Sequence, residues 1–337
     1  MKILLIRFSS IGDIVLTTPL LRCIKAQKPD VEVHYLTKKQ FGPVLAHNPH
    51  IDRLHFLEGD DLPAAVQELK AEKFDFIADL HHNLRTLRVK EALKVNSASF
   101  PKLNIQKWIR TNLRLPVMPD KSIVERYFET LKPLGIANDG GGLEYYIGKE
   151  GETNNEDIPT SHWHGYVACV IGGSYHTKKL PVEQWQRFCQ AVPFPLILLG
   201  SMDDRDEGNA IAAVDPVKIY NSCGKFSLNE SADLIRRSRV VASNDTGLMH
   251  VAAAFQKPIV SFWGNTSPDL GMYPYYGGNN LYSRVSPKSV LLERKKLYCH
   301  PCSKLGYKKC PHGHFRCMKD LDMTEAAAAV ARFWKMG

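Results

Sequence analysis

Two polar turns, each following an apolar run, carry the residue types that could do chemistry. The first is Ser243-Asn244-Asp245-Thr246-Gly247, which lies between the strand-like run Val240 to Ala242 and the helical pattern of Leu248 to Phe255. A turn at the carboxyl end of a strand is where open α/β sheets bind ligands. The free N–H groups at a helix start suit a phosphate, and Gly247 allows its close approach. The same residues also serve a capped helix without a ligand, because Asp245 and Thr246 can cap it.

The second turn lies near the N-terminus. Lys2 to Phe8 reads as a hydrophobic strand, Ser9 to Asp13 as a tight turn, and Ile14 to Lys25 as a helix in which Pro19 marks a kink or a late first turn. Asp13 therefore follows the carboxyl end of a strand. The sequence alone favours a role for Asp13 as the N-cap of the helix. The turn has no G-x-G-x-x-G pattern, so dinucleotide binding is weakly supported.

Alternating strands and helices must position these turns. Apolar runs of strand length alternate with helical patterns, both before a glycine-rich polar stretch and again after it. This alternation predicts an α/β protein with two doubly wound Rossmann-like domains. The glycine-rich stretch, residues 138–157 around a short strand at Leu143 to Ile147, sets the boundary near residue 150. The predicted domains are residues 1–150 and 151–320, followed by a C-terminal helix in residues 321–337.

Composition restricts the class of protein. The chain has 337 residues and a formal net charge of +9, and 44% of its residues are hydrophobic. No apolar run approaches the ~20 residues of a membrane span. The apolar run at the N-terminus is too short for a signal peptide, since Arg7 follows Ile6, so we expect a cytoplasmic protein. The positive charge favours an anionic partner such as a phosphorylated substrate, a membrane surface or a nucleic acid.

Basic residues gather in the N-terminal half. Arg85 and Arg88 precede a segment, Lys102 to Arg114, that contains Lys107 and Arg110 around Trp108. Together they could line a cleft for an anionic substrate. The alternative for each charge taken singly is a solvated helix face.

Several motifs in order resemble those of glycosyltransferase family 9, the bacterial heptosyltransferases. These motifs are residues 10–22 (SIGDIVLTTPLLR), 48–52 (NPHID), 79–85 (DLHHNLR), 224–228 (GKFSL) and 243–250 (SNDTGLMH). The resemblance runs nearly end to end and implies a GT-B fold, in which two Rossmann-like domains face each other across a cleft. One departure is Leu180, where the family usually has Trp. This change leaves the role of Lys178 intact but weakens the assignment of the donor.

The resemblance also implies roles for the residues. It implies an inverting, metal-independent transfer of a heptose-type sugar from a nucleotide-sugar such as ADP-heptose to a lipopolysaccharide core or a related glycan, with no cofactor and no nucleic-acid partner. Asp13 is the implied general base, and Asp79 is the second choice. The implied location is the cytoplasmic face of the inner membrane, where the enzyme would be peripheral, and the final helix would cross back to the first domain. The expected acceptor residues are Ser10, Gly12, Arg85 and Arg88, and the expected donor residues are Ser174, Thr177, Lys178, Asp245, Thr246, Gly247, Leu248 and His250.

The cysteines form two groups. Cys299, Cys302, Cys310 and Cys317 lie in a basic loop with spacing that structural zinc can use, although the expected site set contains no metal. The other four, Cys23, Cys169, Cys189 and Cys223, lie in apolar patterns typical of a core.

Two other functions fit parts of the sequence. A nucleotide-sugar epimerase would use the same cleft, but it needs an acid/base pair rather than one base. A nucleic-acid-binding protein built on the Cys/His loop would concentrate its charge in one stripe, whereas the basic residues are spread along the chain.

Overall fold

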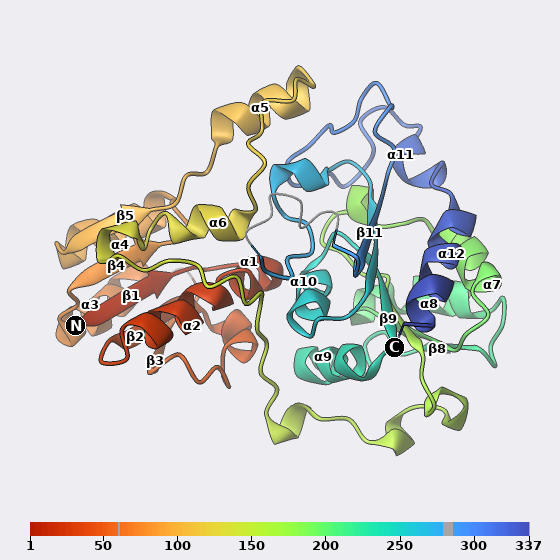
Figure 1. Ribbon diagram of the computed structural model, residues 1–337, viewed down its shortest axis with the longest axis horizontal. Coiled ribbons are helices and arrows are strands. Elements are labelled where there is room, and N and C mark those ends of the chain that lie inside the picture. Colours follow the sequence, from red (N-terminus) through yellow and green to blue (C-terminus); the bar gives the residue numbers. More distant parts are fainter. Residues whose placement is uncertain (60, 279–285, 337) are drawn as a thin grey trace. The chain divides into compact units, whose positions relative to one another are not determined.

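The computed structural model describes residues 1–59, 61–278 and 286–336, and the chain divides into two compact units. The first unit comprises residues 1–103 and 121–146 with a short piece near residue 277, and the second comprises residues 104–120 and most of the chain after residue 147. Figure 1 shows the elements of both units along the chain. The expected boundary near residue 150 thus falls close to the point where the chain leaves the first unit.

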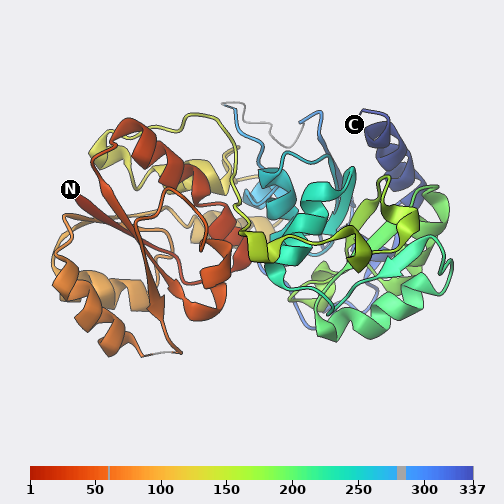
Figure 2. The same cartoon turned by 90° about the horizontal axis from the view of Figure 1, so that it is seen from below.

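The first unit is built on a parallel sheet. Its strand order is β3-β2-β1-β4-β5. Figure 2 shows α3 and α4 on one face of this sheet and α2 and α6 on the other. The strands are β1 (Lys2–Ile6), β2 (Glu32–Lys38), β3 (Arg53–Leu57), β4 (Phe76–Asp79) and β5 (Asn96–Ser99), and the helices are α1 (Ile11–Val15), α2 (Thr18–Gln27), α3 (Leu62–Glu72), α4 (Leu84–Leu93) and α6 (Ile123–Phe128).

Local sequence explains these elements. Ile3 to Ile6 of β1 are fully buried, as expected of a central parallel strand covered on both faces. The predicted helix from Ile14 to Lys25 is two helices, because Pro19 lacks an N–H and is tolerated only in the first turn of α2. The predicted strand at Leu143 to Ile147 is wrong, since that stretch is irregular and forms the connection between the two units.

The second unit has its own parallel sheet, in the order β11-β10-β9-β6-β7-β8. Helix α7 packs against α8 and α12, and α9 packs against α10. The strands are β6 (Val167–Val170), β7 (Leu196–Leu199), β8 (Ile219–Asn221), β9 (Val240–Asn244), β10 (Ile259–Trp263) and β11 (Ser289–Glu293), and the helices are α5 (Asn104–Asn112), α7 (Val182–Ala191), α8 (Arg205–Ala212), α9 (Leu228–Arg237), α10 (Gly247–Ala254), α11 (Arg316–Lys319) and α12 (Met323–Trp334).

Short 3₁₀ helices complete the fold. The segment after β2 is the 3₁₀ helix η1, because Gly42 and Pro43 disfavour an α-helix there. The 3₁₀ segments are η1 (Lys39–Val44), η2 (Lys132–Leu134), η3 (Lys149–Gly151), η4 (Asn155–Asp157), η5 (Thr160–His162), η6 (His176–Lys178), η7 (Met202–Asp204) and η8 (Pro268–Leu270).

The last helix belongs to the second unit. Its Met323, Ala326, Val330 and Phe333 are buried in the core of that unit, and Trp334 stacks on Phe194 with ring centroids 4.0 Å apart. Its apolar face is covered by α7 and the second sheet, and the expected crossing of this helix to the first domain stays a prediction. Within the described ranges, neither α12 nor another helix combines the length and apolarity needed to cross a bilayer.

In each sheet, the order in which the chain adds strands changes direction beside the first strand. In the first unit the reversal falls between β1 and β4, and in the second it falls between β6 and β9. The crevice outside the carboxyl ends of strands at such a point is where open α/β sheets bind ligands. The two polar turns singled out from the sequence follow β1 and β9, so the topology places both at these points.

Candidate active site

An ion pair organises the turn after β9. Asp245 directly follows the strand, and its Oδ2 accepts hydrogen bonds from Lys178 Nζ at 2.7 Å and from Thr266 Oγ1 at 2.8 Å. Lys178 ends η6, which follows β6 on the neighbouring strand. The Lys178 side chain is 19% exposed and that of Asp245 7%. Asp245 thus holds a half-buried cation beside the helix start and is not itself the helix cap.

The start of α10 lacks a side-chain cap. Thr246 occupies the N-cap position, but its hydroxyl makes no capping hydrogen bond. Its Oγ1 is buried and has no hydrogen-bond partner among the described residues. The first N–H groups of α10, at Gly247, Leu248 and Met249, have no intrahelical acceptor, and together with the helix dipole they favour an anion. The expected capping of this helix by Asp245 or Thr246 is therefore not formed.

Asn244 joins this turn to the one after β6. It is fully buried, its Nδ2 donates to Ile171 O at 2.9 Å, and its Oδ1 accepts from the Leu180 N–H at 3.0 Å. The two turns that flank the switch point are therefore locked together. Sequence reasoning missed this role, although asparagine at the end of an apolar strand was a usable signal because strands are depleted in it.

The other residues expected to bind the donor differ in burial and in hydrogen bonding. Ser174 is exposed at the end of the glycine turn, and His250 is buried within α10. Thr177 is almost fully buried, and its hydroxyl accepts from the Tyr307 N–H at 2.8 Å and donates to Tyr307 O at 3.1 Å. The Thr177 hydroxyl thus fixes the loop. Leu180, the departure from the family pattern, is part of the core of the second unit.

Asn265 is a further polar residue beside η6 that sequence reasoning missed. Its main-chain N–H donates to Thr177 O at 3.4 Å, and its side chain is 2% exposed. Neither side-chain amide atom has a partner among the described residues. A buried amide without partners is costly, so such a group marks a place where a ligand could supply the hydrogen bonds. The only sequence signal was its position just after the apolar strand β10.

In the first unit, Asp13 lies in the first turn of α1. Its Oδ2 accepts hydrogen bonds from the Ser10 N–H at 3.2 Å and from Ser10 Oγ at 3.0 Å, and its Oδ1 pairs with Arg7 NH2 at 2.7 Å. Ser10 is the N-cap and Asp13 the third helical residue, so Asp13 serves the helix start without being its cap. Its side chain is 22% exposed, which leaves the carboxylate accessible from solvent.

Arg7 controls the charge of this carboxylate. Burial would raise the pKa of Asp13, but the Arg7 charge and the Ser10 hydrogen bonds outweigh it, so the pKa is lowered from 3.8. Arg7 itself is held by Ser9 O and Leu80 O, each at 2.6 Å. Sequence reasoning missed Arg7, although a charged residue inside an apolar strand pattern was a signal.

His81 follows β4, the strand next to β1. Its ring meets Phe8 edge to face at 5.2 Å. Burial, together with the nearby Arg7 charge, lowers the pKa of His81 to about 4, so the ring is neutral at pH 7. Among described residues its Nδ1 is buried without a partner.

Asp79, the second choice for the base, has a structural role. Its carboxylate is fully buried and accepts from the N–H groups of His81 and His82, from Ser99 Oγ at 3.1 Å and from Lys90 Nζ at 3.0 Å. With both oxygens occupied, it has no free face toward a substrate hydroxyl.

The expected acceptor residues lie on two neighbouring helices. Ser10 is exposed beside Asp13, and Gly12 is buried inside α1. Arg85 and Arg88 lie on α4, which starts at the carboxyl end of β4, and Arg88 is exposed. All four therefore belong to the same edge of the first sheet, on either side of its switch point.

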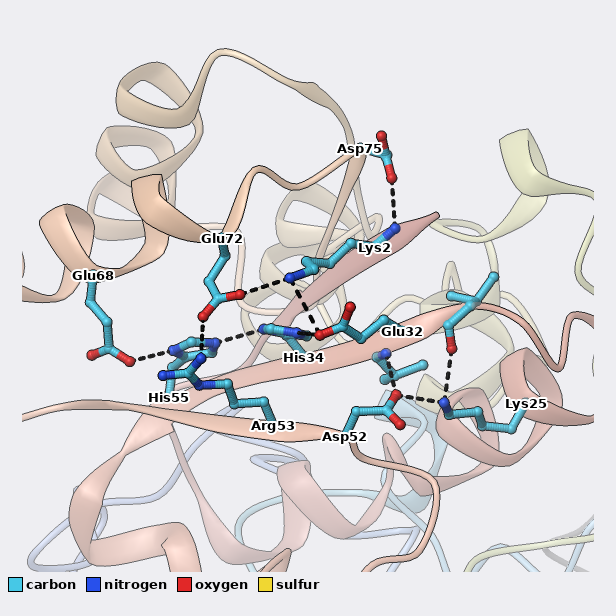
Figure 3. Close-up of polar contacts among 12 residues, drawn as sticks. Lys2, Lys25, Glu32, His34, Asp52, Arg53, His55, Glu68, Glu72 and Asp75 are labelled. Carbon is cyan, nitrogen blue, oxygen red and sulfur yellow. Dashed lines mark hydrogen bonds and ion pairs between the residues drawn. The ribbon is translucent and has the colours of Figure 1, made fainter.

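The structure gathers one group of possible metal ligands among the described residues, and it does not include the cysteines of the basic loop. In this group the ligand atoms of His34, His55 and Glu72 lie within 4.8 Å of one another. Figure 3 shows the histidines in a chain that ends on two carboxylates: Glu32 Oε1 is 2.7 Å from His34 Nε2, and Glu68 Oε1 is 2.7 Å from His55 Nδ1.

The distances in this group fit hydrogen bonds better than metal ligation. His34 Nδ1 and His55 Nε2 are 2.8 Å apart, whereas nitrogens about 2.0 Å from a tetrahedral zinc would lie ~3.3 Å apart. Glu72 already pairs with Lys2 at 2.8 Å and with Arg53 at 2.5 Å. The contacts form a continuous hydrogen-bonded chain from Glu32 through the two rings to Glu68, and burial lowers the pKa of His55.

The four cysteines that the sequence places in a core are found there. Cys23, Cys169, Cys189 and Cys223 are fully buried in the core. Cys299, Cys302, Cys310 and Cys317 are unpaired thiols. Burial raises the pKa of Cys302 to about 11 and that of Cys317 to about 12, so both are protonated at neutral pH.

Two doubly wound units, the first with Asp13 and the second with the Lys178–Asp245 pair at a sheet switch point, are typical of a GT-B glycosyltransferase. Residues 63–304 match the description "Glycosyltransferase family 9 (heptosyltransferase)", and the chain belongs to this family. Lipopolysaccharide heptosyltransferase 2 of Escherichia coli K12 is 25% identical over 310 residues, which cover 80% of this chain and 84% of that protein. This membership favours sugar transfer over the epimerase alternative.

Solved structures give the same fold. A family 9 glycosyltransferase of Veillonella parvula aligns with a TM-score of 0.79 at 19% identity, over 100% of this chain and 98% of that one. An E. coli heptosyltransferase solved with ADP-2-deoxy-2-fluoro heptose aligns with a TM-score of 0.67 at 17% identity, over 100% and 99%. The predicted GT-B fold is confirmed.

Proposed function

We propose that the protein transfers a heptose-type sugar from ADP-heptose to a lipopolysaccharide core or a related glycan, with inversion at the anomeric carbon. The observation that carries the proposal is the ionised, partly exposed carboxylate of Asp13 at the switch point of the first sheet. A relative named as a lipopolysaccharide heptosyltransferase and a structural neighbour solved with an ADP-heptose analogue support this choice of substrates.

In the proposed reaction, Asp13 takes the proton of the acceptor hydroxyl as its oxygen attacks the anomeric carbon. The bond from that carbon to the diphosphate breaks, and the electron pair leaves with ADP. A single displacement by an oxygen on the opposite face inverts the configuration and needs one base. The Arg7 ion pair keeps Asp13 ionised and orients it, at some cost to its basicity.

We place the leaving diphosphate at the start of α10. Lys178 would neutralise the charge that develops on it, and the free N–H groups of the first helical turn would add hydrogen bonds. Thr246 and Asn265 offer buried polar atoms that lack protein partners among the described residues. Because these groups supply positive charge without a metal, we expect transfer to be insensitive to chelators.

We place the acceptor on the first unit, close to Ser10, Gly12, Arg85 and Arg88. An anionic, lipid-linked saccharide suits the exposed arginine on α4 and the net charge of +9. Such an acceptor lies in the inner membrane, so we expect the enzyme to work as a peripheral protein at the cytoplasmic face.

The test is a transfer assay with purified protein, ADP-heptose and heptose-free lipopolysaccharide, followed by release of ADP and by mass spectrometry of the glycan. Parallel reactions contain EDTA, or another nucleotide-sugar such as UDP-glucose. A gain of one heptose that survives EDTA supports the proposal. Release of an isomerised nucleotide-sugar without acceptor would indicate an epimerase instead.

A further inference from the structure

Helix α5 and the segment after it carry apolar side chains that the protein does not cover. Ile105, Trp108, Leu113, Leu115 and Val117 are between 38% and 74% exposed. Over residues 104–120, Thr111 is buried and the rest are exposed or half-buried. We call these five side chains the α5 surface; α5 is the yellow-orange helix labelled in Figure 1. Exposed apolar side chains of this size, close together in the sequence, are typical of interaction sites on soluble proteins.

The segment is nevertheless an ordered part of the second unit. Arg110 Nε donates to Asp269 Oδ2 at 2.8 Å, which ties α5 to the segment η8. Thr111 Oγ1 donates to Lys107 O at 2.9 Å within the helix. Ile105 and Trp108 are three residues apart and so lie on one face of α5. Polar contacts thus hold the helix in place, while its apolar side chains remain exposed to solvent.

The charge around the surface selects its partner. Residues 101–120 contain four basic side chains (Lys102, Lys107, Arg110 and Arg114) and one acidic side chain, Asp120. Two copies of the same positive surface would repel each other, which argues against self-association. A helix with exposed Trp and Ile beside Lys and Arg fits the boundary between anionic headgroups and acyl chains.

We propose that the α5 surface docks the enzyme on an anionic lipid bilayer. Trp108 would lie at the headgroup level, and Ile105 and Leu113 would enter the acyl boundary. The basic side chains other than Arg110, which pairs with Asp269, would face the phosphates. The inference rests on the proposed lipid-linked acceptor, because docking would bring the enzyme to the surface where that acceptor lies.

The test measures binding of the whole protein to vesicles. We expect sedimentation with vesicles of equal parts phosphatidylcholine and phosphatidylglycerol, and little with phosphatidylcholine alone. The double variant Ile105→Ser/Trp108→Ser should lose at least about tenfold in partitioning, because binding scales with the apolar area buried. Arg114→Glu should lower the partitioning onto these vesicles about fivefold for each unit of positive charge removed. Val217→Ser changes an equally exposed apolar residue elsewhere in the second unit and should bind like the parent.

Other outcomes overturn the proposal. Binding of the double variant at parental strength would mean that another surface docks. Concentration-dependent dimers in gel filtration that the double variant abolishes would identify a second copy as the partner. Transfer to the saccharide part of the acceptor, freed of acyl chains, should be unchanged in the double variant. If the parent protein transfers no sugar, the proposed function is contradicted. If the parent transfers sugar but does not bind vesicles, only the docking surface is contradicted.

Discussion

Replacing Asp13 by Asn removes a proton acceptor and keeps the shape of the side chain. The Asn oxygen can still accept from Arg7 and Ser10, but it cannot take the proton of an acceptor hydroxyl. A positioned general base contributes ~10²–10⁴ in rate, so kcat should fall by this factor, or ~3–5 kcal/mol of transition-state stabilisation. Affinity for ADP should stay the same, because Lys178 and α10 lie in the other unit.

The substitution also has a cost in stability. Arg7 is 9% exposed and would lose its charged partner, although it keeps its bonds to Ser9 O and Leu80 O. A hydrogen bond to a charged group is worth ~1.5–3 kcal/mol, so we expect a loss of ~2 kcal/mol in the free energy of unfolding. Asp139→Asn is the matched control, because Asp139 also pairs with an arginine, Arg22, at 2.8 Å in the same unit but away from the sheet edge.

The assay is steady-state release of ADP, with urea denaturation run on the same preparations. Both variants should be destabilised, and Asp13→Asn alone should lose kcat. If Asp13→Asn retains activity within a few-fold of the parent, the base assignment is refuted and Asp13 remains a structural residue of the helix start. Equal losses of kcat in both variants would attribute the effect to stability.

The same carboxylate sets a pH dependence. Its pKa is lowered below 3.8 in the folded protein, so its contribution to stability is present above about pH 4 and is lost as the pH falls further. The acid limb of kcat should likewise lie below about pH 4 wherever the protein stays folded. Arg7→Gln removes the nearby charge and should move that limb to higher pH. An unshifted limb would mean that another group is the base.

Three further predictions concern substrate binding. Lys178→Ala should weaken ADP binding about 10–100-fold, which corresponds to the ~1.5–3 kcal/mol of a charge-assisted hydrogen bond. Asp245→Asn should weaken ADP binding less, because Lys178 keeps its charge and loses only the carboxylate that positions it. Calorimetry with free ADP measures both affinities, and an unchanged affinity in Lys178→Ala would mean that the diphosphate binds elsewhere. Asn265→Ala should weaken ADP binding several-fold. The Tm of the ligand-free protein should stay nearly unchanged, because the buried Asn265 amide has no partner among the described residues. A lower Tm with unaltered affinity would show that Asn265 has a structural role. Arg85→Glu with Arg88→Glu should raise the KM for the acceptor and spare the Kd for ADP, whereas a collapse of ADP affinity would contradict an acceptor role.

Strong local patterns allowed most of the fold to be predicted from the sequence. The strands β1, β7 and β9 are apolar runs bounded by turn residues, and α9 begins at a capping box in which Ser227 and Glu230 bond each other's backbone. The strands β5, β8 and β11 were missed. The first two have half-buried or exposed polar residues, Asn96-Ser97 in β5 and Tyr220-Asn221 in β8, because they lie at or near the edges of their sheets.

The candidate site was only partly predictable, for a different reason. Asp13, Lys178 and the α10 turn stand at strand ends, which a local pattern reveals. The partners of these groups depend on which strands become neighbours. The pairing of Lys178 with Asp245 needs β6 beside β9, and the pairing of Arg7 with Leu80 O needs β1 beside β4. Parallel neighbours far apart in the sequence leave no local signal, so these contacts required the structure.

The His34–His55 pair also bears on how the edge of the first sheet folds. Strand β3 is an outer strand, and such strands can slip or recruit a foreign partner. A slip of one residue against β2 would turn His55 to the opposite face and leave His34 Nδ1 buried without its hydrogen-bond partner. A buried polar atom left without a partner costs ~1–3 kcal/mol, which is a large share of the stability of a small domain. The His34–His55 contact therefore favours the native register of β3 over misaligned or exchanged edge strands while the sheet assembles.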